Sequence, residues 1–271
     1  MGETMTFKDK RIILTGAAGG IGEALARQLA AEGARLALAD LSAERLEPVA
    51  EACRELGSEV LEIPTDVTDR EQCRVLITGT VESWGGIDIL LSNAGVSMWA
   101  RFEDVTDISF FERLMAVNYF GPLYCTYHAL PYLKESRGRI VVVTSSSGKV
   151  GAPLHSGYAA SKHALHGFFD SLRTELAGTG VRITLVAPLH VKTGIRLHRF
   201  RADGSHPSVD PYDDSESKSM TPDQAARIII RAARKGKREV IMTLELKAAV
   251  MLRPFIPGVI DYFARKKVGL T

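Results

Sequence analysis

Short apolar segments alternate with longer amphipathic segments along most of the chain of 271 residues. The apolar segments lie at residues 11–15, 35–40, 59–63, 87–92, 139–144, 182–187 and 238–243. Because they are apolar at consecutive positions, both of their faces should be buried, as in a parallel sheet between two layers of helices. The pattern therefore predicts an α/β fold: one doubly wound domain over residues 1–271, with a mostly parallel sheet of seven strands.

Apolar residues at helical spacing predict helices between these strands. The expected helices lie at residues 20–32, 42–56, 68–84, 107–133 and 156–175, and a last one begins at Thr221. Thr68 and Glu71 have the spacing of a capping box, in which two side chains satisfy free amides at a helix start. Thr221, Pro222 and Gln224 predict a second well-capped start.

Two parts of the chain depart from this alternation. Residues 190–220 are rich in charge, Ser, Asp and Pro, and so long an irregular segment in a compact domain is usually functional or disordered. We expect a substrate loop there. Residues 244–271 form a tail in which Pro254 and Pro257 should separate two short helices. We expect this tail to cover the pocket or to pack on a neighbouring subunit; contact with a membrane surface is the alternative.

Composition narrows the classes of function. Apolar residues make up 45% and charged residues 24% of the chain, as in ordinary globular proteins, and a net charge of +2 predicts no nucleic-acid partner. Cys53, Cys73 and Cys125 lack metal-ligand spacing, so we expect no metal site and reduced thiols in a cytoplasmic protein. No apolar stretch has transmembrane length, and the charged residues 8–11 make a poor signal peptide.

A glycine-rich segment, TGAAGGIG, follows the first predicted strand and opens the first helix. Gly16, Gly20 and Gly22 would let the backbone turn sharply and approach a ligand closely. The free amides at the start of the helix would then face a pyrophosphate. Glycine turns serve many purposes, but the strand–turn–helix context favours a dinucleotide site.

Asp40 ends the second predicted strand, where an acidic side chain can accept hydrogen bonds from the adenosine ribose. The same carboxylate would repel the 2′-phosphate of NADP. Leu41 follows it, and residues 17–19 carry no Arg or Lys. We therefore predict NAD in preference to NADP; an ordinary aspartate in a turn is the alternative.

Tyr158 and Lys162 are four residues apart in a predicted helix, so they share one face. A nearby ammonium favours the phenolate and should lower the tyrosine pKa, which suits proton transfer near neutral pH. A core tyrosine beside a surface lysine is the alternative.

Taken together, several motifs resemble the short-chain dehydrogenase/reductase superfamily over residues 7–193. The motifs are TGAAGGIG, Asp66–Val67, Asn93–Ala94–Gly95, Asn118, Ser145 and Tyr158–x3–Lys162. The resemblance implies a Rossmann domain and a homodimer or homotetramer. The catalytic residues that it implies are Asn118, Ser145, Tyr158 and Lys162. The cofactor-binding residues that it implies are Gly16, Gly20, Ile21, Gly22, Asp40, Asp66, Val67, Asn93, Ala94, Gly95, Tyr158, Lys162, Pro188 and Thr193.

The resemblance also implies individual roles. Tyr158 would exchange a proton with the substrate oxygen, Ser145 would orient that oxygen, and Asn118 would hold a water in a proton relay. Ser146 and Ser147 are neighbours of Ser145, and spacing alone selects among the three. The family usually has glycine after the proline that follows the sixth strand, whereas this chain has Leu189, so the role of the nearby Thr193 is the least secure.

The function expected is an NAD(P)-dependent oxidoreductase acting on a hydrophobic secondary alcohol or ketone. The segments IVVVTSSSGKV and YAASKHALHGFFDSLRTEL most resemble hydroxysteroid dehydrogenases, and this resemblance implies a steroid- or lipid-like substrate. A non-catalytic dinucleotide-binding regulator and a sugar-nucleotide epimerase are the alternatives. Six apolar residues are candidates for the pocket wall: Met98, Trp99, Val150, Leu154, Leu189 and Leu197. We expect three histidines near Tyr158 to be structural or exposed: His155, His163 and His166.

Overall fold

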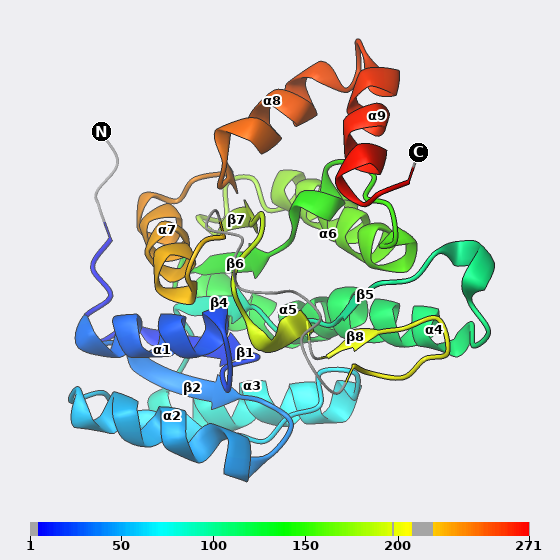
Figure 1. Cartoon of the computed structure of the whole chain (residues 1–271). Coiled ribbons are helices and arrows are strands. Elements are labelled where there is room, and N and C mark those ends of the chain that lie inside the picture. The colour runs from blue at the N-terminus through cyan, green and yellow to red at the C-terminus, as the bar shows by residue number, and fades with distance from the viewer. Residues whose placement is uncertain (1–4, 197, 208–218, 271) are drawn as a thin grey trace.

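The computed structural model describes residues 5–196, 198–207 and 219–270. A seven-stranded sheet with the order β3-β2-β1-β4-β6-β7-β9 lies at its centre (Figure 1). Every pair of neighbouring strands in this sheet is parallel, which confirms the predicted fold class. The strands are β1 (Arg11–Thr15), β2 (Arg35–Ala39), β3 (Val60–Glu62), β4 (Ile89–Ser92), β6 (Arg139–Val143), β7 (Arg182–Ala187) and β9 (Glu239–Ile241).

Helices cover both faces of the sheet (Figure 1). One layer consists of α1 (Ile21–Ala31), α2 (Ala43–Glu55) and α7 (Pro222–Lys235). The other layer consists of α3 (Arg70–Trp84), α5 (Gly121–Glu135) and α6 (Ser156–Glu175). Because successive residues of a strand point to opposite faces, Ile12 packs under the first layer and Ile13 under the second. Burial on both faces is why the strands are apolar at consecutive positions.

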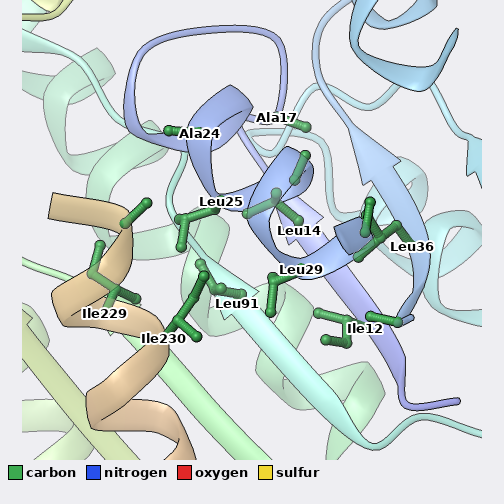
Figure 2. Close-up of a cluster of buried hydrophobic side chains, with 14 of the residues drawn as sticks. Ile12, Leu14, Ala17, Ala24, Leu25, Leu29, Leu36, Leu91, Ile229 and Ile230 are labelled. Carbon is green, nitrogen blue, oxygen red and sulfur yellow. The ribbon is translucent and has the colours of Figure 1, made fainter. Parts of the chain in front are cut away.

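The core of the first layer joins α1 to α7, two helices that are far apart in the sequence (Figure 2). Leu25 and Leu29 of α1 pack with Ile229 and Ile230 of α7 over Leu91 of β4, and all five side chains are buried. Burying one such side chain contributes about 1.5–3 kcal/mol. This cluster therefore holds the segment that follows β1 firmly against the sheet.

Several predicted element boundaries are confirmed, but the capping box predicted for the start of α3 is wrong. The capping box of Thr221 and Gln224 is present at the start of α7. The start of α3 is capped instead by Asp69, whose side chain accepts hydrogen bonds from the Glu71 and Gln72 amides. The box predicted for Thr68 fails because the Thr68 hydroxyl bonds to Asp66.

The helix expected at residues 107–133 is continuous but not uniform. It consists of α4 (Ser109–Met115), a π-helical turn η2 (Ala116–Phe120) and α5. A π turn is usually a single insertion within a helix and is frequent at functional sites. Asn118 lies in this turn.

The irregular segment contributes a small second sheet that sequence patterning missed. β8 (Arg199–Phe200) pairs in parallel with β5 (Ser97–Met98). Short 3-10 turns lie at η1 (Phe102–Asp104), η3 (Ser146–Gly148) and η4 (Gly194–Arg196). Leu197 and residues 208–218 of the expected substrate loop lie outside the described residues.

The tail forms two short helices, as predicted. They are α8 (Leu244–Leu252) and α9 (Pro257–Lys267), and they project from the edge of the molecule above α6 (Figure 1). Within the described ranges, no helix is both long and apolar enough to span a bilayer.

Candidate functional site

A hollow of about 930 Å³ lies where the carboxyl ends of β1, β2, β4, β6 and β7 meet. We call it the central hollow. The strand order reverses between β1 and β4, and ligands of open parallel sheets bind at such a switch point. The predicted site residues that line it are Gly16, Gly20, Ile21, Asp40, Asp66, Val67, Asn93, Ala94, Gly95, Ser145, Tyr158, Lys162, Pro188 and Thr193. Gly22 and Asn118 do not line it.

The glycine turn between β1 and α1 leaves no room for side chains at three of its positions: Gly16, Gly20 and Gly22. Gly16 and Gly20 have φ of 66° and 52°, in the left-handed region that favours glycine. A Cβ on Gly16 would lie 2.7 Å from the Ala94 Cα, and one on Gly22 would lie 1.9 Å from the Gly16 oxygen. Gly20 caps α1 without any side-chain hydrogen bond. The turn therefore offers main-chain amides at a helix start, which is a suitable cradle for a pyrophosphate.

Asp40 is held at the other end of the central hollow. Its carboxylate accepts hydrogen bonds from the Ala18 amide at 3.0 Å and the Leu41 amide at 2.9 Å. It also accepts one from Arg45 Nε at 2.8 Å. Arg45 lines the hollow as well, and the sequence prediction missed it because it lies one helical turn into α2. The negative charge of Asp40 and the positive charge of Arg45, which both bear on the choice between NAD and NADP, are thus held in one ion pair.

Asp66 and Val67 lie beside Asp40 on the wall of the hollow. The Asp66 carboxylate accepts hydrogen bonds from the Thr68 amide and hydroxyl, and the Asp66 amide donates to Gln72. These contacts fix the segment between β3 and α3 without help from a ligand.

The turn after β4 is bonded directly to the glycine turn. Asn93 Nδ2 donates to the Gly16 oxygen at 2.9 Å, and the Asn93 and Ala94 amides donate to Thr15 Oγ1. Gly95 completes the turn, and a Cβ there would lie 3.1 Å from Asn118 Oδ1 and 3.4 Å from Lys162 Nζ. The two turns therefore form one rigid wall of the hollow.

Asn118 is buried behind this wall, and its side-chain amide forms hydrogen bonds through both Oδ1 and Nδ2. Oδ1 accepts from the Val96 amide, while Nδ2 donates to the Val96 oxygen at 2.9 Å and to Ser161 Oγ at 3.0 Å. These bonds join η2 to α6 and to the segment after β4. They leave no hydrogen of the side chain free to hold a water.

Ser145, Tyr158 and Lys162 converge on the central hollow from β6 and α6. Ser145 follows the carboxyl end of β6, and its hydroxyl accepts a hydrogen bond from the Ser147 amide. Of the three neighbouring serines, Ser145 is the one whose side chain acts on the Tyr158 hydroxyl, whose pKa it tends to lower. Lys162 Nζ donates to the Val143 oxygen at 3.2 Å and lies 5.8 Å from the centre of the Tyr158 ring.

Burial dominates the electrostatics of this trio. It lowers the pKa of Lys162 to about 8, because the ammonium is removed from water. It also raises the pKa of Tyr158, against the opposing effect of the hydrogen bond with Ser145. The expected lowering of the tyrosine pKa by Lys162 is therefore wrong for this arrangement, in which the ammonium bonds to the Val143 carbonyl.

Pro188 and Thr193 close the hollow from the segment after β7. The Pro188 oxygen accepts a hydrogen bond from the Ser146 amide at 2.9 Å. The methyl group of Thr193 would lie 2.9 Å from a Cβ placed on Gly20, so Thr193 packs directly over the glycine turn. Leu189 is half-buried and is not part of the wall.

The substrate side of the hollow differs from the expected apolar wall. Met98, Trp99, Val150, Leu154 and Leu189 do not line it, because Met98 is buried and Leu154 faces a smaller pocket. Leu197 lies outside the described residues. The residues found there instead include Val96, Val117, Phe200, Arg113, His155, His198 and His206.

One of the three histidines near Tyr158, which were expected to be structural or exposed, lies in the wall of the hollow. His155 lines the hollow, and its ring centre lies 6.0 Å from that of Tyr158. His163 and His166 both belong to α6, where His163 is exposed and His166 is buried, as expected. The position of His155, three residues before the tyrosine at the end of a turn, is the only signal that could have identified it. Among the residues that the structure describes, no cluster of potential metal ligands occurs.

Comparison with known proteins places this arrangement in context. The family model for short chain dehydrogenases matches residues 10–203. A protein named 11-beta-hydroxysteroid dehydrogenase-like 3 from Arabidopsis thaliana is 38% identical over 93% of this chain and 79% of its own length. The 11-beta-hydroxysteroid dehydrogenase A of Sesamum indicum is 37% identical over 94% of this chain and 74% of its own length.

Two solved structures share the fold. A short chain dehydrogenase/reductase from Burkholderia phymatum in complex with NAD has a TM-score of 0.82, with 24% identity over 94% of this chain and 96% of the other. An alcohol dehydrogenase from Thermococcus sibiricus complexed with 5-hydroxy-NADP has a TM-score of 0.75, with 28% identity over 87% of this chain and 96% of the other. The neighbours thus carry nicotinamide dinucleotides of both kinds.

Proposed function

We propose that this chain, which belongs to the short-chain dehydrogenase family, transfers a hydride between NAD and a hydrophobic secondary alcohol or ketone. Membership of the family makes it an oxidoreductase acting on CH–OH groups with a nicotinamide cofactor. One observation carries the proposal for this chain's own site. Ser145, Tyr158 and Lys162 meet at the same hollow as a glycine turn in which a side chain would collide with the backbone.

The residues present fit a dinucleotide along the whole hollow. The turn at Gly16 and Gly20 would hold the pyrophosphate, while Asp40 and Asp66 would hold the adenosine end. When bound, the nicotinamide supplies the hydride chemistry. We assign the preference to NAD because the Asp40 carboxylate is fixed by two main-chain amides at the position that a 2′-phosphate would approach.

The chain's own residues manage the proton. Tyr158 would take the proton of the alcohol hydroxyl during oxidation and return it during reduction, and Ser145 would hold the substrate oxygen. The raised pKa of Tyr158 favours the phenol, which is the proton donor for carbonyl reduction. Lys162 would supply a positively charged ammonium group next to Tyr158 in the hollow. The water relay proposed for Asn118 would use an oxygen of this residue as the acceptor, because both hydrogens of its side-chain amide are already donated.

We propose hydrophobic secondary alcohols and ketones, steroid- or lipid-like in size, as the substrates. The names of the relatives from Arabidopsis thaliana and Sesamum indicum support this class. Val96, Val117 and Phe200 supply apolar surface on the substrate side of the hollow.

A Tyr158→Phe variant tests the proton role. With NAD and a set of hydrophobic secondary alcohols that includes 1-indanol and a hydroxysteroid, kcat/KM should fall about 10²- to 10⁴-fold, because proton transfer by a positioned side chain contributes that much. The dissociation constant for NAD should change little. Tyr127→Phe removes a hydroxyl from an exposed tyrosine on α5 and is the matched control. Activity of Tyr158→Phe equal to that of the control would refute the role.

The assembly and the location are also proposals. Four apolar positions on α6 could serve an interface: of these, Leu165, Phe169 and Leu172 are buried against the sheet, and Phe168 is partly buried against the same core. The largest exposed apolar side chains gather instead on α8 and α9, so we propose a homodimer or homotetramer that covers this tail. Three buried, free cysteines support a reducing, cytoplasmic location.

A further inference from the structure

A strained turn presents His155 to the central hollow just before α6. Leu154 has φ of 66°, a conformation that costs a residue with a side chain on the order of 1–3 kcal/mol. The turn is kept in place by hydrogen bonds from the Ala100 amide to the Leu154 oxygen at 3.0 Å and from the His155 amide to the Ala152 oxygen at 3.2 Å. Backbone strain that the surroundings maintain is a reason to look for a function.

The imidazole of His155 is fixed in one tautomer. Nδ1 lies 2.9 Å from the Pro153 oxygen, and a carbonyl oxygen can only accept a hydrogen bond. Nδ1 therefore carries the proton and donates. The ring also packs edge-on against Trp99, with ring centres 5.0 Å apart, so it cannot turn freely.

The other ring nitrogen is consequently a hydrogen-bond acceptor on a residue that lines the hollow. Burial lowers the pKa of His155, so the ring is neutral near pH 7 and Nε2 has a free lone pair. Across the described ranges, no hydrogen bond reaches Nε2, and it is not among the buried polar atoms that lack a partner. Since His155 lines the hollow beside Tyr158, this lone pair is accessible from the substrate side.

We infer that His155 Nε2 accepts a hydrogen bond from a second hydroxyl group of the substrate, close to the alcohol carbon that is oxidised. The inference rests on the proposed function and narrows its substrate class to hydrophobic diols and the corresponding hydroxyketones. The ring centres of His155 and Tyr158 lie 6.0 Å apart, so both side chains can contact one small substrate.

The same lone pair discriminates against similar molecules. A substrate without the second hydroxyl displaces water from Nε2 and leaves it unpaired, which costs binding free energy. A substrate with a methoxy or keto oxygen at that place brings two acceptors together, and a site built for a hydroxyl rejects such analogues. One net hydrogen bond corresponds to a preference of about 3- to 10-fold.

Three probes test the inference on the unaltered enzyme: 1,2-indanediol, 1-indanol and 2-methoxy-1-indanol, each with saturating NAD. Initial rates of NADH formation give kcat/KM for oxidation at C1. The diol should exceed both other alcohols by about 3- to 10-fold or more, because it alone offers a donor to Nε2. Equal values for the diol and its methyl ether would overturn the inference.

Variants assign the preference to the residue. His155→Phe keeps an aromatic ring against Trp99 but removes the acceptor, so the ratio of diol to 1-indanol should fall towards one. His155→Gln keeps an oxygen that can accept and should retain part of the preference. His163→Phe, a change at an exposed histidine on the adjoining helix α6, should leave the ratio unaltered. A purely structural role of His155 would slow both alcohols alike and keep the ratio.

The outcomes separate the two proposals. Turnover of the alcohols without a preference for the diol, or a preference that survives in His155→Phe, contradicts the role of His155 alone. Failure of the unaltered enzyme to oxidise any hydrophobic secondary alcohol with NAD or NADP contradicts the proposed function, and the inference fails with it.

Discussion

Asp40 and Arg45 form an ion pair at the adenosine end of the hollow, with 2.8 Å between the carboxylate and Nε. The pair sets two opposite charges where the two dinucleotides differ by a phosphate. In the unaltered protein the Asp40 carboxylate holds the Arg45 guanidinium. The same carboxylate lines the hollow and accepts hydrogen bonds from two main-chain amides. The choice between NAD and NADP should therefore depend on the aspartate first and on the arginine only when the aspartate is absent.

We expect the unaltered enzyme to prefer NAD by at least about ten-fold in kcat/KM, because placing like charges together costs several kcal/mol. Asp40→Ala should lose most of this preference, since it removes the repulsion and frees Arg45 to bind a 2′-phosphate. Adding Arg45→Ala should remove the NADP activity that the first change gained. Steady-state kinetics with both cofactors measure all three effects.

Arg27→Ala is the matched control, because Arg27 is an exposed arginine paired with Glu23 on α1, away from the hollow. A clear NADP preference of the unaltered enzyme would contradict the prediction. An unchanged cofactor ratio in Asp40→Ala would contradict it as well.

At the scale of elements, α1 begins so close to the glycine turn that its second residue must be glycine. In an ordinary helix, exchanging glycine for alanine stabilises by about 1 kcal/mol. At Gly22 the added Cβ would meet the Gly16 oxygen at 1.9 Å, which is main chain and cannot move alone. The sign of the effect should therefore be reversed.

We expect Gly22→Ala to destabilise the protein by about 1–3 kcal/mol, the usual cost of overpacking, and to weaken NAD binding more than ten-fold. Thermal denaturation and calorimetric titration with NAD measure the two effects. Gly19→Ala lies in the same turn, where a Cβ would meet nothing within 4 Å, and should have a free energy of unfolding within about 0.5 kcal/mol of the unaltered protein. Identical behaviour of the two variants would refute the steric account.

The elements that the sequence predicts well are those with long patterns. The alternation of seven apolar strands with six amphipathic helices leaves a periodic signal in the sequence. That signal also places the glycine turn and Asp40 at strand ends and Tyr158 in a helix. β5 and β8 are only two residues long and carry no period, so they were missed. Thr68 and Asp69 are both good helix caps, and the competing bond from Thr68 to Asp66 decided between them.

The site was predicted less completely than the fold. Residues with a motif of their own were placed at the hollow, whereas Arg45 was not named and His155 was expected to be structural or exposed, because their positions in the hollow depend on contacts across space. Arg45 matters through Asp40, and His155 matters through a turn bonded to Ala100. The effect of Lys162 on the tyrosine pKa was also wrong, since spacing on a helix does not tell that the ammonium bonds to Val143.

At the scale of the whole molecule, α8 and α9 present the largest group of exposed apolar side chains. Phe255 is 81% exposed, Met251 72%, Phe263 62% and Tyr262 53%. Uncovered apolar surface of this kind in one place marks a contact with another molecule. We propose that a second copy of the chain covers it.

We expect light scattering after gel filtration to give two or four times the chain mass of 29.5 kDa. Combining Phe255→Glu with Phe263→Glu should give monomers, because burying two carboxylates in an apolar interface is costly. Val75→Glu, at an exposed apolar residue of α3, should leave the assembly intact. A monomeric unaltered protein that co-floats with phospholipid vesicles would contradict the proposal and favour a membrane surface.

The sheet order also has a consequence for how the chain is made. Starting from β1, the strands β2 and β3 add to one edge and β4, β6, β7 and β9 add in turn to the other, so the sheet can widen in the order of synthesis. The apolar surface of α1, however, is covered by Ile229 and Ile230 of α7, which follow α1 by almost two hundred residues in the sequence. A ribosome-bound chain must therefore carry this surface uncovered until α7 has been synthesised, which makes it a target for chaperones and the place where misassembly would begin.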